Sequence, residues 1–421
     1  MKKVQKRFDM YKKPNKPIWY FKLVIKLVAP FYCLFSNSHT KVDKEVKKIK
    51  APYFILATHH AFLDFPQLAA AIAPKTTNWV IAVDEFRRGD WLMRGIGGIA
   101  KRKFTHDIST TKNMIYSLRQ LKQSVAIYPE ARFSLAGVNE KLDGALGKFC
   151  KFANVPVLMF KSFGNFINSP QWCKKPYKKI RKEAHLYVLY TVEQLQSMTA
   201  EQVQNGIEEA FVRDEYRWQV ENNYHVKCKK RAKGLHRLLY KCPNCGNEHE
   251  MQSEGIYLWC SHCGAKWEMD TLSRLKGVNT DKGFSHIPDW YNWEREEVRK
   301  EVQNGTYHFE DDVRVEDFYS GKVGFIPVGD AHMTHDKDGF KFVGTVDGQP
   351  FEVHKLVSDM YSLHIEYDFI KRGDAIDIAT DKTTYFMYPK TAKNCLTKLH
   401  FATEELYDFY VRNKRQTEGK V

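Results

Sequence analysis

Short apolar runs alternate with amphipathic stretches through the first half of the chain. Five runs have the length and the β-branched or aromatic content of strands, and helical patterns such as residues 111–122 lie between them. The predicted strands are residues 53–57, 79–83, 124–128, 155–160 and 184–189. This alternation predicts an α/β domain over residues 37–226, with a mixed, mostly parallel sheet flanked by helices.

The pattern changes after residue 199. Thr199 and Gln202 form a capping box, which predicts the start of one long helix running to about residue 226. A helical pattern returns at residues 288–303, and from about residue 313 the chain shows short alternating runs with hairpin signals at Asp338-Gly339 and Asp347-Gly348. An amphipathic helix at residues 391–411 closes the chain, so we expect a β-rich domain over residues 312–421. Several strands followed by one closing helix resemble a pleckstrin-homology-like (PH-like) barrel, as in GRAM domains.

The N-terminal 36 residues form a basic amphipathic segment. An apolar stretch at residues 18–35 is interrupted by Lys22, Lys26 and Pro30, and the preceding 16 residues carry seven Lys or Arg against the single Asp9. This pattern is typical of a helix lying in a membrane interface. It is equally typical of an amphipathic helix packed on its own domain, and it is too polar for a membrane-spanning segment.

Length and charge limit the possibilities further. A chain of 421 residues is too long for a single core and predicts two or three domains. The net charge of +16 favours an anionic partner, which could be nucleic acid, an anionic lipid, or a phosphorylated or acidic carrier. Nine cysteines, of which only four cluster, indicate a reducing compartment rather than a disulfide framework.

The four clustered cysteines form two matching Cys-x2-Cys pairs. Cys242 and Cys245 precede Cys260 and Cys263, with 14 residues between the pairs and a glycine after each. Four thiolates in this spacing predict a structural Zn²⁺ site, because a complete four-sulfur shell leaves no position for catalysis. We therefore expect a small zinc ribbon with a basic flank over residues 227–275, followed by a helical linker over residues 276–311.

A candidate general base precedes the first predicted helix of the α/β domain. His59 follows the strand at residues 53–57, and Asp64 lies five residues later in the first turn of the helix. A histidine oriented by a carboxylate can remove a proton near neutral pH. The spacing alone is also compatible with a structural histidine.

Residues 17–195 resemble the glycerolipid acyltransferase superfamily, which includes the 1-acylglycerol-3-phosphate acyltransferases. The family's His-x4-Asp block is present as His59 to Asp64, and a glycine-rich block follows at residues 95–102 and ends in Arg102. The Pro-Glu-Gly-Thr-Arg block is similar to residues 129–134, and an apolar strand with an internal proline follows at residues 155–157.

The resemblance implies a role for each matched residue. His59 takes the proton of an acceptor hydroxyl while that hydroxyl attacks an acyl thioester, and Asp64 fixes the imidazole. Arg102 and Arg132 are expected to bind the acceptor's head group, and Glu130 to organise that part of the site. Acyl-CoA or acyl carrier protein is the implied donor, and 1-acylglycerol-3-phosphate or a related lysolipid the implied acceptor, in phospholipid biosynthesis. The neighbouring His60 is expected to face solvent or to pack.

Two departures from the family pattern concern the acceptor. Thr58 replaces the usual Asn before the histidine, and Ala131-Arg132-Phe133 replaces Gly-Thr-Arg, so that the arginine comes one residue early. In an extended segment a shift of one residue turns a side chain to the opposite face. Either the turn is remodelled so that Arg132 still reaches the pocket, or the acceptor is not bound through its phosphate in the usual way.

Two hypotheses follow for the whole chain. The first is a peripheral O-acyltransferase on the cytoplasmic face of the cell membrane, with an anionic membrane surface as a partner and nucleic acid as an unlikely one. The second is a zinc-ribbon adaptor that binds nucleic acid or membrane and carries an inactive acyltransferase domain. An intact His59–Asp64 pair favours the first, because an inactive domain would be free to lose it.

Overall fold

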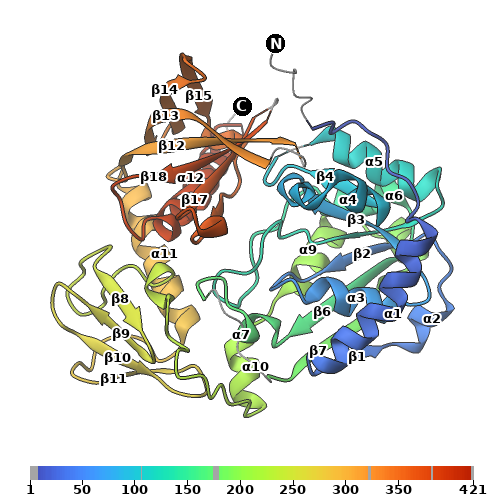
Figure 1. Cartoon of the computed structure of the whole chain (residues 1–421), viewed down its shortest axis with the longest axis horizontal. Helices are drawn as coiled ribbons and strands as arrows, with labels where there is room; N and C mark the ends of the chain where they lie inside the picture. Colours follow the sequence, from blue (N-terminus) through green and yellow to red (C-terminus); the bar gives the residue numbers. More distant parts are fainter. Residues whose placement is uncertain (1–7, 106, 174–179, 321–323, 381–382, 419–421) are drawn as a thin grey trace. The chain divides into compact units, whose positions relative to one another are not determined.

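The computed structural model describes residues 8–105, 107–173, 180–320, 324–380 and 383–418. The chain divides into two compact units, one built mainly from residues up to 225 and the other mainly from residues 226 onward. Each unit has sheets of its own (Figure 1). The first unit contains the His59–Asp64 pair, and the second contains the clustered cysteines.

The first unit is built on a seven-stranded sheet in the order β1-β7-β6-β2-β5-β3-β4. The β6–β7 pair is antiparallel and the other five neighbouring pairs of this sheet are parallel, so the predicted mixed and mostly parallel sheet is confirmed. The strands are β1 (Ser38–Val42), β2 (Phe54–Ala57), β3 (Thr77–Ala82), β4 (Gly98–Lys101), β5 (Ser124–Ile127), β6 (Val157–Phe163) and β7 (Lys182–Tyr190). The sequence pattern did not indicate the edge strands β1 and β4, because β1 is mostly polar and β4 is very short.

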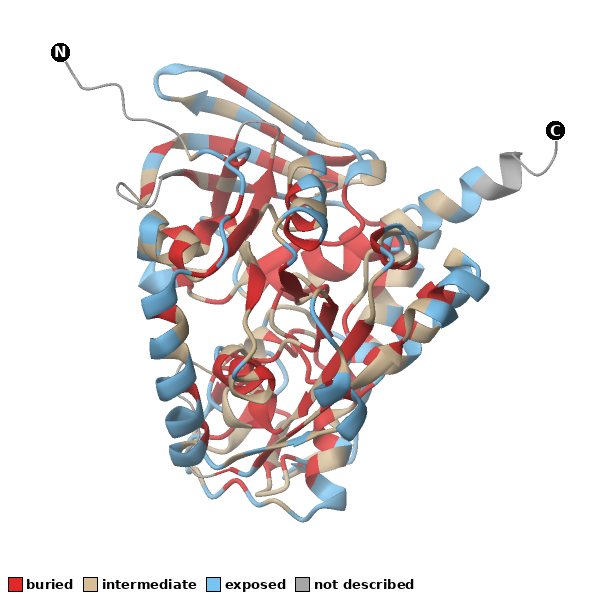
Figure 2. Cartoon of the chain, turned by 90° about the vertical axis from the view of Figure 1, so that its right-hand side faces the viewer, coloured by how far each residue is buried: buried red, intermediate tan, exposed pale blue. Residues whose placement is uncertain are grey.

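Helices cover both faces of this sheet. Alternate residues of β2 point to opposite sides: Phe54 and Leu56 belong to one apolar core, and Ile55 and Ala57 belong to the other. The first core is closed by α5 (Ile108–Arg119), α6 (Leu146–Ala153), α8 (Val192–Ser197) and α9 (Ala200–Phe211), and the second by α1 (Trp19–Phe35), α2 (Lys44–Lys48) and α3 (Asp64–Ile72). The central strands are accordingly buried, as Figure 2 shows in red. The short helices η1 (Val83–Arg88), α4 (Asp90–Gly95) and α7 (Asn165–Asn168) complete the connections.

The helix expected from residue 199 to about residue 226 is broken. The Thr199 capping box is present, but α9 ends at Phe211 and a separate helix, α10 (Glu215–Glu221), follows. Val212 has extended backbone angles, and the Asp214 carboxylate accepts the backbone N–H groups of Tyr216 and Arg217 to begin α10. The expectation of one continuous helix is therefore wrong, and the break turns Arg213 toward the interior.

Helix α1 packs on its own domain and also presents an apolar outer face. Phe21, Ala29 and Cys33 are buried, and α1 lies against α3. Large apolar side chains on the other side of α1 are exposed: Trp19, Leu23, Val24, Leu27, Val28, Phe31, Leu34 and Phe35. None of the helices in the described part of the chain is long and apolar enough to cross a bilayer. The first seven residues of the basic tail lie outside the described residues.

The second unit begins with a small antiparallel sheet in the order β11-β10-β9-β8. Its strands are β8 (Met251–Glu254), β9 (Tyr257–Cys260), β10 (Lys266–Met269) and β11 (Leu275–Gly277), preceded by the 3-10 helix η2 (Leu235–Arg237). Helix α11 (Ile287–Gln303) follows, and the buried indole of its Trp290 contacts Trp267 of β10 edge to face. The four clustered cysteines lie on and beside this sheet.

The C-terminal part contains a seven-stranded antiparallel sheet closed by one helix. Its order is β15-β14-β13-β12-β18-β17-β16, so a four-stranded and a three-stranded meander join where β12 pairs with β18. The strands are β12 (Phe309–Ser320), β13 (Gly324–Asp336), β14 (Gly339–Val346), β15 (Gln349–Lys355), β16 (His364–Glu366), β17 (Ala375–Ala379) and β18 (Thr384–Pro389). Both predicted hairpin turns are present, and Asp347 and Gly348 take the positive φ angles that such a turn requires. The 3-10 helices η3 (Val357–Asp359) and η4 (Phe369–Lys371) precede the closing helix α12 (Leu396–Glu418).

Candidate active site

The polar residues of the site gather at one edge of the mixed sheet. Strands β5, β2 and β6 are parallel neighbours, so the segments after their carboxyl ends lie side by side. Thr58 follows β2, and its hydroxyl accepts the N–H of Ser162 on β6 at 3.0 Å. This contact ties the start of the His59 segment to the neighbouring strand.

Asp64 is the most strongly anchored carboxylate of the site. It is fully buried at the start of α3. Its Oδ2 accepts the backbone N–H groups of His60 at 2.5 Å and Ala61 at 2.9 Å, and its Oδ1 accepts Ser162 Oγ at 3.1 Å and Asn165 Nδ2 at 2.6 Å. Burial by itself raises the pKa of Asp64, but the hydrogen bond from His59, the charge of the protonated His59 and the backbone N–H of His60 outweigh it and hold the pKa below its usual value. Asp64 is therefore an ionised, fixed acceptor at neutral pH.

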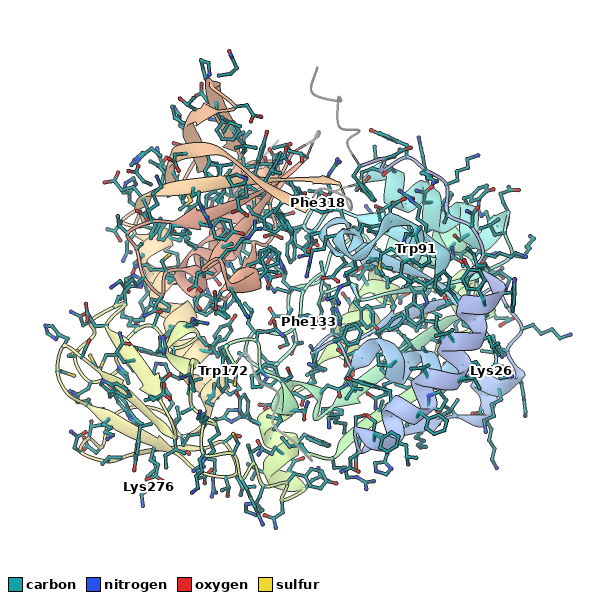
Figure 3. The ribbon with its side chains drawn as sticks, in the orientation of Figure 1. Lys26, Trp91, Phe133, Trp172, Lys276 and Phe318 are labelled. Atoms are coloured by element: carbon teal, nitrogen blue, oxygen red, sulfur yellow. The ribbon has the colours of Figure 1, made fainter. Side chains whose placement is uncertain are left out.

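The imidazole of His59 is held against this carboxylate. Its Nδ1 lies 3.3 Å from Asp64 Oδ2, and its backbone N–H donates to Glu130 Oε2 at 3.1 Å. The ring stacks on Tyr128 with a centroid separation of 4.0 Å, and Phe133, which is labelled in Figure 3, approaches it at 4.3 Å. With 21% of its side chain exposed, His59 has its Nδ1 engaged and its Nε2 available to a substrate.

Glu130 organises the backbone around His59 and is paired with an arginine that the sequence did not indicate. Its two oxygens accept Arg213 Nη1 at 2.8 Å and Nη2 at 2.9 Å, and both side chains are fully buried. Glu130 Oε1 also accepts the N–H of Glu140 at 2.9 Å. Arg213 is 83 residues away in sequence, and only the break between α9 and α10 brings it here. No motif could have pointed to it.

His60 does not face solvent. It is fully buried, and its Nε2 lies 3.2 Å from the Ser162 carbonyl oxygen and 3.1 Å from Arg213 Nε. Burial, together with the charge of Arg213, lowers the pKa of His60 well below its usual value. Glu215 lies 3.5 Å from the same ring nitrogen, and burial raises the pKa of Glu215 to about 8. Of the two expectations for His60, packing is the one observed.

Arg132 forms a buried ion pair with Glu140. Its Nη2 lies 2.6 Å and its Nε 3.2 Å from Glu140 Oε2, and only 1% of the arginine side chain is exposed. Glu140 Oε1 accepts the N–H of Leu135 at 2.8 Å, which fixes the carboxylate to the following loop. Separating such a pair costs about 3–5 kcal/mol, because a charge is left buried without its partner. Ala131 has a φ of 58°, so the turn keeps the left-handed residue that a glycine would supply.

Arg102 lies in a different part of the sheet. It directly follows β4, the edge strand, and β3 and β5 separate β4 from β2. Three strand spacings correspond to about 14 Å between these backbones. Arg102 is half-buried and makes its own contacts. Within the described residues, no hydrogen bond or ion pair that we observe joins Arg102 to His59 or Asp64.

The four cysteines of the second unit are brought together. The sulfur atoms of Cys242, Cys245, Cys260 and Cys263 all lie within 4.8 Å of one another and could hold a metal ion. Cys242 Sγ is 3.7 Å from Cys263 Sγ, and Cys245 Sγ is 3.9 Å from Cys260 Sγ. Gly246 and Gly264 both have a φ of 76°, which closes a tight turn after each pair.

Comparisons with known proteins include a distant structural likeness. No protein family model and no curated protein matches the chain. Among solved structures, the chain is similar to the 1-acyl-sn-glycerophosphate (LPA) acyltransferase PlsC from Thermotoga maritima, with a TM-score of 0.37 and 16% identity, over 48% of this chain and 80% of that chain. This likeness is too weak to support a functional conclusion, which therefore has to come from the side chains of the site.

Proposed function

We propose that this protein is a peripheral membrane O-acyltransferase that moves a fatty acyl group from acyl-CoA or acyl carrier protein to the hydroxyl of a lysolipid. The observation that carries the proposal is the His59–Asp64 pair. Its carboxylate is buried, ionised and held by four hydrogen bonds besides the one to His59, and its imidazole has one accessible nitrogen. A fixed histidine–carboxylate pair of this kind is suited to general-base catalysis.

The geometry suggests how the reaction runs. Asp64 accepts the Nδ1–H of His59, which leaves the lone pair of Nε2 to take the proton of the acceptor hydroxyl. The hydroxyl oxygen then forms a bond to the thioester carbonyl carbon, and the carbon–sulfur bond breaks. The imidazolium returns the proton to the departing thiolate. No covalent acyl-enzyme is required, so neither a serine nor a cysteine nucleophile is needed.

Direct measurement of acyl transfer tests the proposal. Purified protein is given a long-chain acyl-CoA or acyl carrier protein with a panel of lysolipid acceptors, and both the released thiol and the acylated lipid are measured. The proposal requires both products in equal amounts. Absence of transfer to every acceptor, with zinc bound and vesicles present, would favour the alternative of an adaptor with an inactive acyltransferase domain.

We also propose that the four-cysteine cluster binds one structural Zn²⁺. In a tetrahedral site with Zn–S bonds of about 2.3 Å, the sulfur atoms are about 3.8 Å apart. The two separations of 3.7 and 3.9 Å fit that geometry. Four thiolates complete the zinc shell, so the metal would support folding of the ribbon and take no part in acyl transfer.

The membrane-facing part of the proposal rests on α1. Its outer face carries eight exposed large apolar side chains, and Lys26 (labelled in Figure 3) lies on the same helix. Exposed apolar residues beside basic ones are typical of a helix that binds an anionic membrane surface. We place the protein on the cytoplasmic face of the cell membrane.

The C-terminal pair of meanders closed by α12 supports a PH/GRAM-like domain in residues 312–421.

A further inference from the structure

Phe133 and Arg132 together bear on which acceptor the site can take. Phe133 stands where the resemblance leads us to expect an arginine, and its ring lies 4.3 Å from the ring of His59. Tyr128 stacks on the same imidazole at 4.0 Å, so two aromatic rings contact His59. A hydroxyl that reaches His59 Nε2 therefore arrives beside an apolar wall.

The nearby arginines are already matched by carboxylates. Arg132 is paired with Glu140, and Arg213 is paired with Glu130 by two hydrogen bonds. Both guanidinium groups are buried, and Glu140 is additionally fixed by the N–H of Leu135. A phosphate that drew Arg132 away from this pair would leave the buried Glu140 carboxylate without its cation.

The net charge of the residues around His59 also disfavours a phosphate. The two arginine–glutamate pairs cancel, His60 is neutral because its pKa is lowered by burial, and Asp64 remains ionised. These residues together leave one negative charge beside the imidazole. A phosphate group next to the reacting hydroxyl would add a second anion close to the buried Asp64 carboxylate.

We propose that the acceptor is a lipid alcohol with an uncharged head group, such as a 1-acylglycerol, and that Phe133 and the Arg132–Glu140 pair exclude a phosphate next to the reacting hydroxyl. This inference rests on the proposed acyltransferase function and specifies its acceptor. It replaces the expectation, taken from the family resemblance, that Arg132 binds a phosphate.

The test compares two acceptors that differ only in the phosphate, 1-acylglycerol and 1-acylglycerol-3-phosphate, with the same acyl chain and the same donor. We expect kcat/KM to be at least tenfold higher for 1-acylglycerol. Phe133→Arg should shift the ratio of the two kcat/KM values toward the phosphate acceptor by tenfold or more, and Phe133→Leu, the matched control, should not. A wild-type preference for the phosphate acceptor would overturn the inference, above all if Arg102→Ala abolished it. An unchanged ratio in a folded Phe133→Arg protein would also overturn it.

A binding measurement separates this inference from the proposed function. Short-chain forms of the two acceptors, used below the concentration at which they form micelles, are titrated into the His59→Ala protein. Tighter binding of the uncharged acceptor supports the pocket chemistry even if the wild type transfers no acyl group, in which case only the proposed function fails. Tighter binding of the phosphate acceptor overturns the inference independently of catalysis.

Discussion

At the scale of single residues, the role of His59 is the most direct point to test. His59→Ala should lower kcat for acyl transfer by about 10²–10⁴-fold, because the general base is removed while the binding surface remains. The matched control is His185→Ala, because His185 lies on β7, the strand beyond β6, and its Nε2 pairs with Asp43 Oδ1 at 2.8 Å. Steady-state rates with both variants at equal thermal stability decide the matter. Equal losses from the two substitutions would contradict the assignment.

Glu215 gives the fold a specific pH dependence. Its pKa of about 8 lies above its usual 4.5, so the folded protein keeps this proton where the unfolded chain releases it. Stability from this group is fully present below pH 4.5 and is lost as the pH rises toward 8, by up to about 1.4 kcal/mol per pH unit. Glu215→Gln can still accept the Gly164 N–H and should remove this loss.

Denaturant unfolding of wild type and Glu215→Gln at pH 5, 6, 7 and 8 measures the effect. The wild type should become progressively less stable relative to the variant across this range. A constant difference between the two proteins would mean that Glu215 is ionised in the folded state, with Arg213 as its effective partner.

At the scale of elements, α1 has two apolar faces, of which the inner one is buried and the outer one is exposed. Its inner face packs on α3, so deleting the helix would also expose the core of the first unit. Substitutions on the outer face avoid this problem. Leu27→Glu combined with Phe31→Glu should weaken binding to anionic vesicles by at least about tenfold, because two buried apolar side chains are worth more than 1.4 kcal/mol together.

Vesicle sedimentation at low and high salt provides the measurement. Val278→Glu is the control, because Val278 is also exposed but lies in the second unit. If the α1 double variant and the control sediment alike with vesicles, the outer face of α1 is not the membrane contact.

At the scale of the whole molecule, metal binding and folding of the ribbon should be coupled. Freshly purified protein should contain one zinc per chain, and chelation should unfold the ribbon, because the binding energy of a structural zinc is folding energy. Elemental analysis together with hydrogen exchange of residues 241–277 reports both effects. Cys242→Ser should lose the metal, and Cys228→Ser, which lies outside the cluster, should retain it. Full zinc content in Cys242→Ser would contradict this.

The sequence by itself determined the features that depend on neighbours in the chain. These features are the strand alternation, the capping box at Thr199, the hairpin glycines and the cysteine spacing. Each depends on residues that are close together in the chain, so its periodicity or turn requirement can be recognised in the sequence. The His59–Asp64 pair belongs here too, because five residues of one strand–turn–helix segment suffice to bring the two side chains together.

Only the tertiary structure decided which charges meet around that pair. Arg213 reaches Glu130 because α9 ends at Phe211, and Arg132 is held in a buried ion pair because Glu140, eight residues later, returns to meet it. The burial of His60 also depends on residues distant in sequence, because Ser162 of β6 and Glu215 of α10 pack against its ring. Sequence order cannot show such pairings, because a buried charge must find a partner and the completed fold alone decides which distant residue supplies it.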